Sequence, residues 1–205
     1  MAPPTVLFLD VGGVCLTNGW DHVARREAAD RFDLDFQETE RRHGAMYAEF
    51  ERGELELDDY LRHVVFFRDR PFSREDFVDF MRGRSRAHAD VLELVRRVRD
   101  TGTVRLATIN NESRMLNEYR IGRFGLDRLF EAFFSSCYLG VRKPSERIFR
   151  TALDVLDVDA SEALFLDDRE ENVVGARTVG LRAEVLHGRA DAMTEILEGA
   201  GVALS

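Results

Sequence analysis

The chain has 205 residues, of which 44% are hydrophobic and 33% charged, a balance typical of one folded domain with a sizeable core. Its formal net charge of −9 argues against a nucleic-acid-binding face or a face for anionic membranes. No apolar run approaches the roughly 20 residues that cross a bilayer, no basic leader stands at the N-terminus, and two cysteines are too few for a disulfide framework. We therefore expect a cytoplasmic protein.

Most of the chain shows alternating helix and strand patterns. Residues 5–9, TVLFL, predict a first buried strand, and the alternation resumes from about residue 86. We expect helices that include residues 91–98, 145–156 and 171–180, and strands over residues 103–108, 163–168 and 181–186. Such alternation predicts the α/β class, with a doubly wound parallel sheet and helices on both faces.

Residues 18–84 follow a different pattern, because they are helical almost throughout and rich in charge. Ser73 followed by Asp76 is typical of a helix start. We expect a small helical unit over residues 18–84, inserted into a core made of residues 1–17 and 85–205.

Reactive polar side chains stand where strands of this core are expected to end. Asp10, Thr108 and the pair Asp167 and Asp168 each follow an apolar strand, and Lys143 precedes a helix. Each alone could be an ordinary turn or cap residue. The carboxyl ends of parallel strands, however, lie at one edge of a sheet. Carboxylates about 4 Å apart repel by roughly 4 kcal/mol at an effective dielectric of 20, so a hard divalent cation such as Mg²⁺ is expected beside them.

The order of these motifs resembles the haloacid dehalogenase superfamily. The motifs are Asp-x-Gly-Gly-Val from Asp10, the strand-end Thr108, Lys143 before a proline, and Asp-Asp-x-x-x-Asn from Asp167. The segments FERGELELDDYL, LGVRKPSERIF and LFLDDREENVVGA are similar to the phosphatase-like subgroup with a helical cap that includes the alpha-glucose-1-phosphate phosphatases. The resemblance covers nearly the whole chain, and implies a Rossmann-like core with residues 18–84 as the cap.

The resemblance also implies a hydrolase that works through an aspartyl-phosphate. Asp10 would be the nucleophile, and Mg²⁺ would be held by the Asp10 side chain, the Gly12 carbonyl and Asp168. Thr108 would bind a phosphoryl oxygen, and Lys143 would neutralise charge on the nucleophile and the phosphate. The implied substrate is a small phosphorylated metabolite, with a sugar phosphate as one candidate.

Four further residues receive supporting roles. Asp167 is expected to orient Lys143 or a metal-bound water, and Asn172 to fix the loop that follows. Asn110 and Asn111 either contact substrate oxygens or cap the next helix.

Gly12 departs from the phosphatase pattern, in which a second aspartate protonates the leaving alcohol. Loss of acid–base help costs a factor of about 10²–10⁴ unless it is replaced. Three outcomes are open: a substrate with a good leaving group, a proton donor from Asp21, His22 or His43, or a non-catalytic phosphate- or partner-binding relative. A 2-haloacid dehalogenase is a further alternative, which the acidic pair disfavours.

Overall fold

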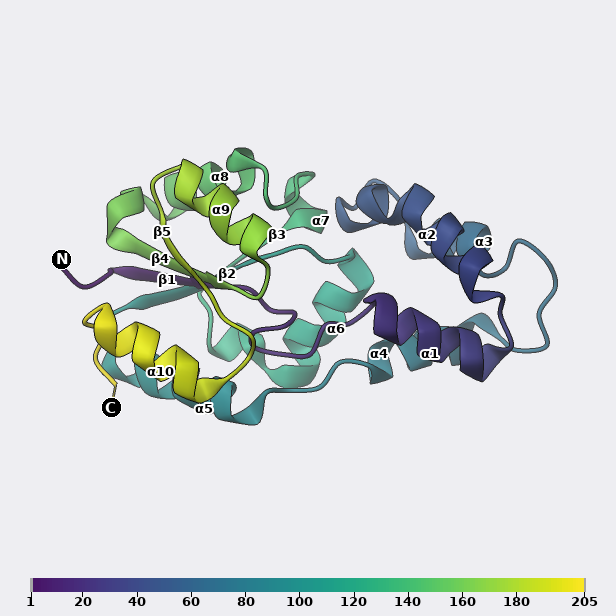
Figure 1. Ribbon diagram of the computed structural model, residues 1–205, viewed down its shortest axis with the longest axis horizontal. Helices are drawn as coiled ribbons and strands as arrows, with labels where there is room; N and C mark the ends of the chain where they lie inside the picture. Colours follow the sequence, from purple (N-terminus) through teal and green to yellow (C-terminus); the bar gives the residue numbers. More distant parts are fainter. Residues whose placement is uncertain (1, 205) are drawn as a thin grey trace.

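The computed structural model describes residues 2–204. Within them, five strands form one parallel sheet in the order β3-β2-β1-β4-β5 (Figure 1). The strands are β1 Val6–Leu9, β2 Arg105–Asn110, β3 Ala132–Ser135, β4 Ala163–Asp167 and β5 Arg182–Val185. This α/β arrangement confirms the predicted fold class.

Helices cover both faces of the sheet. Figure 1 shows α8 and α9 on one face and α5 and α10 on the other. The helices after the first strand are α1 His22–Phe32, α2 Phe36–Glu51, α3 Leu57–Val64, α4 Arg74–Gly83, α5 Ala89–Thr101, α6 Arg114–Phe124, α7 Ser136–Leu139, α8 Glu146–Leu156, α9 Glu170–Thr178 and α10 Ala190–Gly199. Short 3-10 turns lie at Leu126–Arg128 and Ala160–Glu162. No helix within the described range is long and apolar enough to cross a membrane.

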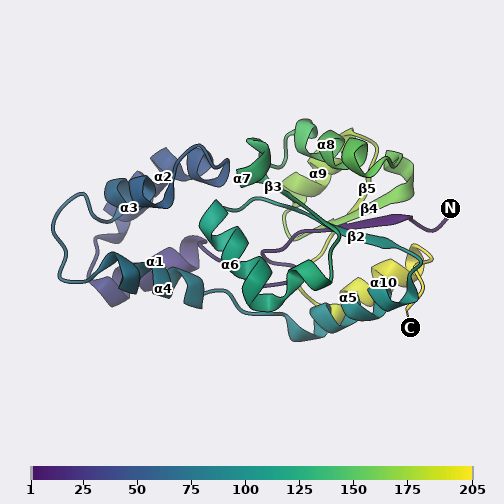
Figure 2. The same ribbon diagram turned by 180° about the vertical axis from the view of Figure 1, so that it is seen from behind.

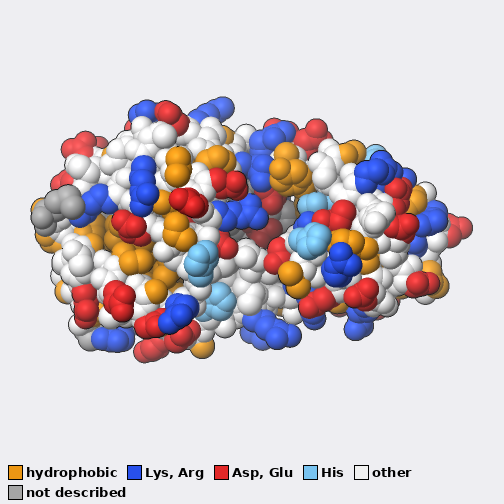
Figure 3. Space-filling view, in the orientation of Figure 1, with side chains coloured by type: hydrophobic (Ala, Val, Ile, Leu, Met, Phe, Trp, Pro, Cys, Tyr) orange, Lys and Arg blue, Asp and Glu red, His pale blue; other side chains and the backbone are white. Residues whose placement is uncertain are grey.

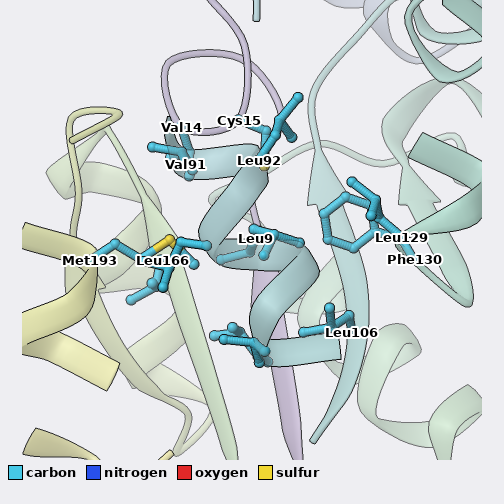
Figure 4. Packing of buried hydrophobic residues seen from close by; sticks show 14 of the residues in the cluster. Leu9, Val14, Cys15, Val91, Leu92, Leu106, Leu129, Phe130, Leu166 and Met193 are labelled. Atoms are coloured by element: carbon cyan, nitrogen blue, oxygen red, sulfur yellow. The ribbon is translucent and has the colours of Figure 1, made fainter. Parts of the chain in front are cut away.

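The central strand β1 is buried on both faces, which explains its uninterrupted apolar sequence. Leu7 and Leu9 point into the cluster formed with α5 and α10, whereas Val6 and Phe8 point into the cluster formed with α8 and α9. Figure 4 shows Leu9 packed among the first cluster. Successive side chains of β1 thus point to opposite faces of the sheet, and the strand ends at Leu9, directly before Asp10.

Helices α1–α4, which we call the cap, lie beyond one end of the sheet (Figures 1 and 2). They pack around their own apolar cluster, which includes Phe32, Tyr60, Leu61 and Phe77. The predicted helix start at Ser73 is present as a complete capping box with Asp76. Leu116 of α6 belongs to the same cluster, so these side chains hold the four helices together and also pack them against the core.

Two connecting segments, residues 17–21 and 84–88, join the cap to the core. They run beside each other, because the backbone N–H of Thr17 donates to the carbonyl of Arg86 and Leu16 bridges to Ala87. The cap is therefore attached to the core by a paired linker.

The structure corrects two details of the predicted sheet. β2 begins and ends two residues later than expected, so that Thr108 lies inside the strand, opposite Leu9. The edge strand β3 was not predicted from the sequence. Its first two residues are only partly buried, and its four residues are too short to establish a clear periodicity.

Candidate active site

Three carboxylates meet at the carboxyl end of the sheet. β1 and β4 are hydrogen-bonded neighbours with Leu9 opposite Leu166, so Asp10 and Asp167 leave the sheet at the same level. One oxygen from each of Asp10, Asp167 and Asp168 lies within 4.8 Å of the others. The predicted convergence of these acids is therefore present.

Lys143 bridges two of the three acids. Its Nζ lies 2.9 Å from Asp10 Oδ1 and 2.6 Å from Asp167 Oδ2, and it also donates to the carbonyl of Ile109 at 2.7 Å. These contacts use all three donors of the ammonium group. Asn111 holds the lysine's backbone on both sides, since its amide donates to the Lys143 carbonyl and accepts from the Lys143 N–H. The ammonium is thus fixed in place and fully buried.

Asp167 is saturated by hydrogen bonds. Its Oδ1 accepts from the Arg169 N–H at 2.9 Å and from Asn172 Nδ2 at 3.0 Å, while Oδ2 accepts from Lys143. Its side chain is completely buried. Asp167 therefore orients Lys143 and the following loop, and leaves Asp10 and Asp168 as the carboxylates that face the cavity.

The two carboxylate oxygens of Asp10 differ in their contacts. Oδ1 accepts from the Val11 N–H at 2.8 Å and contacts Lys143, whereas Oδ2 has no hydrogen-bond partner among residues 2–204. Burial raises the pKa of Asp10 to about 7; Lys143 opposes this effect, and the charges of Asp167 and Asp168 add to it. A bound cation would favour the ionised form.

Asp168 is seated against the glycine pair. A Cβ at Gly13, whose φ is +82°, would lie 2.1 Å from Asp168 Oδ2, so any other residue there would displace the carboxylate. Asn18 Nδ2 donates to the same oxygen at 3.3 Å. Two cavity-facing carboxylates beside the backbone of Gly12 form an all-oxygen donor set of the kind that Mg²⁺ prefers.

The guanidinium group of Arg120 lies in the space beside Gly12. A Cβ at Gly12 would lie 3.1 Å from Asn18 Oδ1 and 3.5 Å from Arg120 Nη1. The same Nη1 forms a 2.8 Å ion pair with Glu112 Oε2, and both side chains are buried. A side chain at position 12 would therefore contact a guanidinium group.

Arg120 also connects the two linkers of the cap. Its Nη2 donates to the Thr17 carbonyl and its Nε donates to Ser85 Oγ, both at 3.0 Å. A Cβ at Gly19 would lie 2.1 Å from Arg120 Nη2. The sequence patterns missed this role, because Arg120 lies in α6, about a hundred residues from the first linker.

A cavity of about 430 Å³ opens between the core and the cap above these groups. Figure 3 shows the hollow between the two lobes, with acidic and basic side chains at its rim. The cap contributes Arg25, His43, Tyr47 and Glu51 to the lining. Glu51 and Arg142, which sequence reasoning left without a role, form a 2.6 Å ion pair across the two lobes. Their motifs, FERGE and GVRKP, were visible, but their pairing depends on the docking of the cap.

The three predicted proton donors all line the cavity, each with a partner. Asp21 accepts from the Ala24 N–H and caps α1. His22 Nδ1 lies 2.9 Å from Glu40, and His43 Nδ1 lies 2.8 Å from the Tyr60 hydroxyl.

The structure does not bring Thr108 or Asn110 to the cavity. Thr108 is completely buried within β2, and its Oγ1 has no hydrogen-bond partner in the described part of the chain. Asn110 is also buried, where it donates to Asn117 and accepts from Ser135. The two-residue displacement of β2 is the reason: the first cavity-lining side chain after this strand is Asn111.

A parallel sheet with an aspartate–lysine–aspartate cluster at its carboxyl edge, beside a unit of four helices, is the arrangement of an α/β hydrolase. The chain belongs to the haloacid dehalogenase-like hydrolases, because residues 5–180 match that family.

Phosphatases are among the curated relatives. The sesquiterpene phosphatase astK of Aspergillus oryzae is 28% identical over 178 residues, which are 85% of each chain. The glyceraldehyde 3-phosphate phosphatase of Pyrococcus abyssi is 37% identical over 87 residues, 42% of this chain and 36% of that one. The magnesium complex of the haloacid dehalogenase family enzyme bt-2542 from Bacteroides thetaiotaomicron has the same fold, with a TM-score of 0.81, 17% identity, and coverage of 95% of this chain and 98% of that one.

Proposed function

We propose that this hydrolase is a Mg²⁺-dependent phosphatase that acts on a small phosphorylated metabolite. The observation that carries the proposal is the contact of buried Lys143 with Asp10, beside a second cavity-facing carboxylate, Asp168. The phosphatase relatives and the magnesium-bound structural neighbour support it. We also propose that residues 18–84 act as a cap domain on a core of residues 1–17 and 85–205.

In the proposed reaction, Asp10 Oδ2 attacks the phosphorus atom, since Oδ1 is already held by Lys143 and the Val11 N–H. The new O–P bond forms as the ester P–O bond breaks, and the leaving group departs as an alkoxide that takes a proton from water. A second water then cleaves the aspartyl-phosphate, which releases phosphate and restores the Asp10 carboxylate. Lys143 stabilises negative charge on Asp10 and on the transferred group. Asp10, Asp168 and the Gly12 carbonyl would hold Mg²⁺, which neutralises charge on the phosphoryl oxygens when bound.

The leaving alcohol receives no proton from position 12. The site therefore favours substrates whose leaving group has a low pKa, such as an anomeric phosphate ester or an acyl phosphate, which is a mixed anhydride. The placement of Thr108 gives it no part in this proposal, and Asn111 acts by holding the Lys143 loop.

The test is a phosphatase assay with p-nitrophenyl phosphate, glucose 1-phosphate, glyceraldehyde 3-phosphate and acetyl phosphate, in Mg²⁺ and in EDTA. We expect turnover that needs Mg²⁺ and disappears in Asp10→Asn. Turnover that persists in Asp10→Asn contradicts the mechanism. A folded wild-type protein that turns over none of these substrates supports the non-catalytic alternative. Chloride release from a 2-chloro acid without Mg²⁺ would identify a dehalogenase instead.

A further inference from the structure

A chain of hydrogen bonds runs through the wall of the cap. Trp20 Nε1 lies 2.7 Å from the Tyr60 hydroxyl oxygen, and the same oxygen lies 2.8 Å from His43 Nδ1. Tyr60 is completely buried, with its ring stacked on Phe50 at a centroid distance of 4.1 Å. Trp20 and His43 both line the cavity above the carboxylates. The chain thus connects one cavity-lining residue to another through the interior of the cap.

The direction of each hydrogen bond follows from the chemistry of the three groups. The indole N–H of Trp20 can only donate, so the Tyr60 oxygen accepts there. Burial raises the pKa of Tyr60 above its ordinary value, so the phenol keeps its proton. The Tyr60 hydroxyl donates to His43 Nδ1, which lies 2.8 Å away. If Nδ1 donated instead, the hydroxyl proton of Tyr60 would be buried without an acceptor. His43 Nδ1 therefore accepts, and the ring proton lies on Nε2.

The imidazole of His43 is neutral at physiological pH. Burial of the ring and the charge of Arg25 lower its pKa to about 4, and the opposing effect of Glu40 is smaller. A neutral ring whose Nδ1 accepts has one N–H, at Nε2. That nitrogen has no hydrogen-bond partner among residues 2–204, and it is not sealed from solvent. The neighbouring Gly44 has no side chain that could cover the ring.

The charged groups of the surrounding wall are paired with each other. Arg25 forms a two-pronged ion pair with Glu40, and Arg142 pairs with Glu51. Arg120 pairs with Glu112 through a single contact. These pairs offer little to a second anionic group, whereas the Nε2–H of His43 remains free to donate to an uncharged acceptor.

We infer that His43 is a specificity-determining residue, and that its Nε2–H donates to an uncharged oxygen, a hydroxyl or a carbonyl, on the alcohol part of the phosphate ester. This inference rests on the proposed phosphatase function and adds a substrate class to it. Tyr60 and Trp20 are positioning residues, because they act through His43. The polar wall distinguishes the expected substrate from a purely hydrocarbon ester.

The first experiment reads the tautomer directly and needs no turnover. Two-bond ¹H–¹⁵N correlation spectra of the wild-type protein at pH 7 should show a neutral His43 with its proton on Nε2, and Tyr60→Phe should change this pattern. His63→Phe provides a matched assignment control from the outer side of the cap, since His63 lies outside the cavity lining. A protonated His43, or a proton on Nδ1, would overturn the inference even if the protein is an active phosphatase.

The second experiment compares kcat/KM for glucose 1-phosphate and for p-nitrophenyl phosphate, which has no hydroxyl on its alcohol part. His43→Phe should lower the value for the sugar ester about tenfold, as expected for one lost hydrogen bond to a substrate hydroxyl, and leave that for the aryl ester within about twofold. Tyr60→Phe should give a smaller loss in the same direction, and His63→Phe none.

Equal effects of His43→Phe on both esters, or no effect on either, would overturn the inference. Turnover of the aryl ester but of no ester that carries a hydroxyl or a carbonyl would also overturn it while leaving the phosphatase function standing. Absence of all turnover removes the proposed function and the substrate class with it, and the tautomer measurement then reports only on the hydrogen-bond chain.

Discussion

The two walls of the cavity differ in how they hold their polar groups. At the edge of the sheet, Lys143 carries a buried charge between Asp10 and Asp167, and all its donors are used. In the cap, Tyr60 carries no charge and donates one hydrogen bond to His43 Nδ1. The charged wall, formed by Lys143 and its aspartates, is suited to a phosphoryl group, whose charge changes during reaction. The neutral wall, by which we mean only the uncharged Trp20–Tyr60–His43 chain, is suited to recognition of the remainder of the substrate. The difference suggests that chemistry and selectivity can be altered separately.

The charged wall is most directly broken at Lys143. Lys143→Met removes the ammonium and leaves Asp10 and Asp167 buried without their common partner. We expect a loss of about 3–5 kcal/mol in the free energy of unfolding, measured by urea denaturation, together with loss of turnover. Arg150→Met, at an exposed ion pair on α8, is the control and should change stability by less than about 1 kcal/mol. A comparably small effect at Lys143 would contradict the buried-cluster account.

The charged wall can also be tested through the pH dependence of Mg²⁺ binding. The pKa of Asp10 is raised from 3.8 to about 7 by folding, so without metal this group stabilises the protein below pH 4 and loses that contribution as pH rises toward 7. Mg²⁺ binds the ionised carboxylate, and should therefore bind more tightly as pH rises from 6 to 8. At 100 times its Kd it should add about 2.7 kcal/mol of stability. The measurement is the melting temperature in Mg²⁺ and in EDTA at each pH, with Asp168→Asn as the variant that should lose the response. An Mg²⁺ effect that does not vary with pH would contradict this prediction.

The contact between cap and core can be tested with substitutions at Gly53, which follows α2, and at Gly44 within α2. A Cβ at Gly53, whose φ is +71°, would lie 2.3 Å from the Cys137 carbonyl, where α2 meets α7. Gly53→Ala should therefore destabilise the protein by about 1–3 kcal/mol and reduce turnover, because the cap wall is displaced. Gly44→Ala is the matched control: no atom lies within 4 Å of its added methyl group, and a helical alanine should stabilise by about 0.5–1 kcal/mol. Equal effects of the two substitutions in urea denaturation would show that docking at Gly53 is not tight.

Gly12→Asp is expected to have the smallest effect. An aspartate there would meet Arg120 Nη1, so it would stay ionised and would not protonate a leaving group. We expect kcat/KM to change by less than about threefold for esters with good or poor leaving groups, against the 10²–10⁴ that a working general acid supplies. Gly12→Ala controls for the added bulk. A gain of tenfold or more on alkyl phosphates alone would show that Arg120 does not neutralise the new acid.

The sequence predicted the charged wall better than the neutral one for a physical reason. Asp10, Asp167 and Asp168 follow strongly apolar strands, and parallel strands bring their carboxyl ends together whatever surrounds them. Thr108 was misplaced because a two-residue shift of β2 changes which side chains leave the sheet at its end. This register is set by pairing with β1 and β3, and β3 itself shows no clear periodicity.

The neutral wall depends on contacts between segments far apart in the chain. His43 was recognised as a cap histidine, but its partner Tyr60 lies on the next helix, where it is completely buried. Arg120 was a candidate for substrate contact, but its partners could not be predicted, because they lie in both linkers and in the loop before α6. Patterns within one helix reveal which face is buried, but not which hydrogen bond a buried hydroxyl makes.

The central claim, that Asp10 is the phosphorylated nucleophile, is tested most directly by acid-quenching the protein during turnover of acetyl phosphate in Mg²⁺ and mapping the modified peptide by mass spectrometry. The account predicts one phosphoryl group on the peptide that carries Asp10, removed by hydroxylamine and missing from Asp10→Asn. Steady turnover with the phosphoryl group on a different peptide would contradict it.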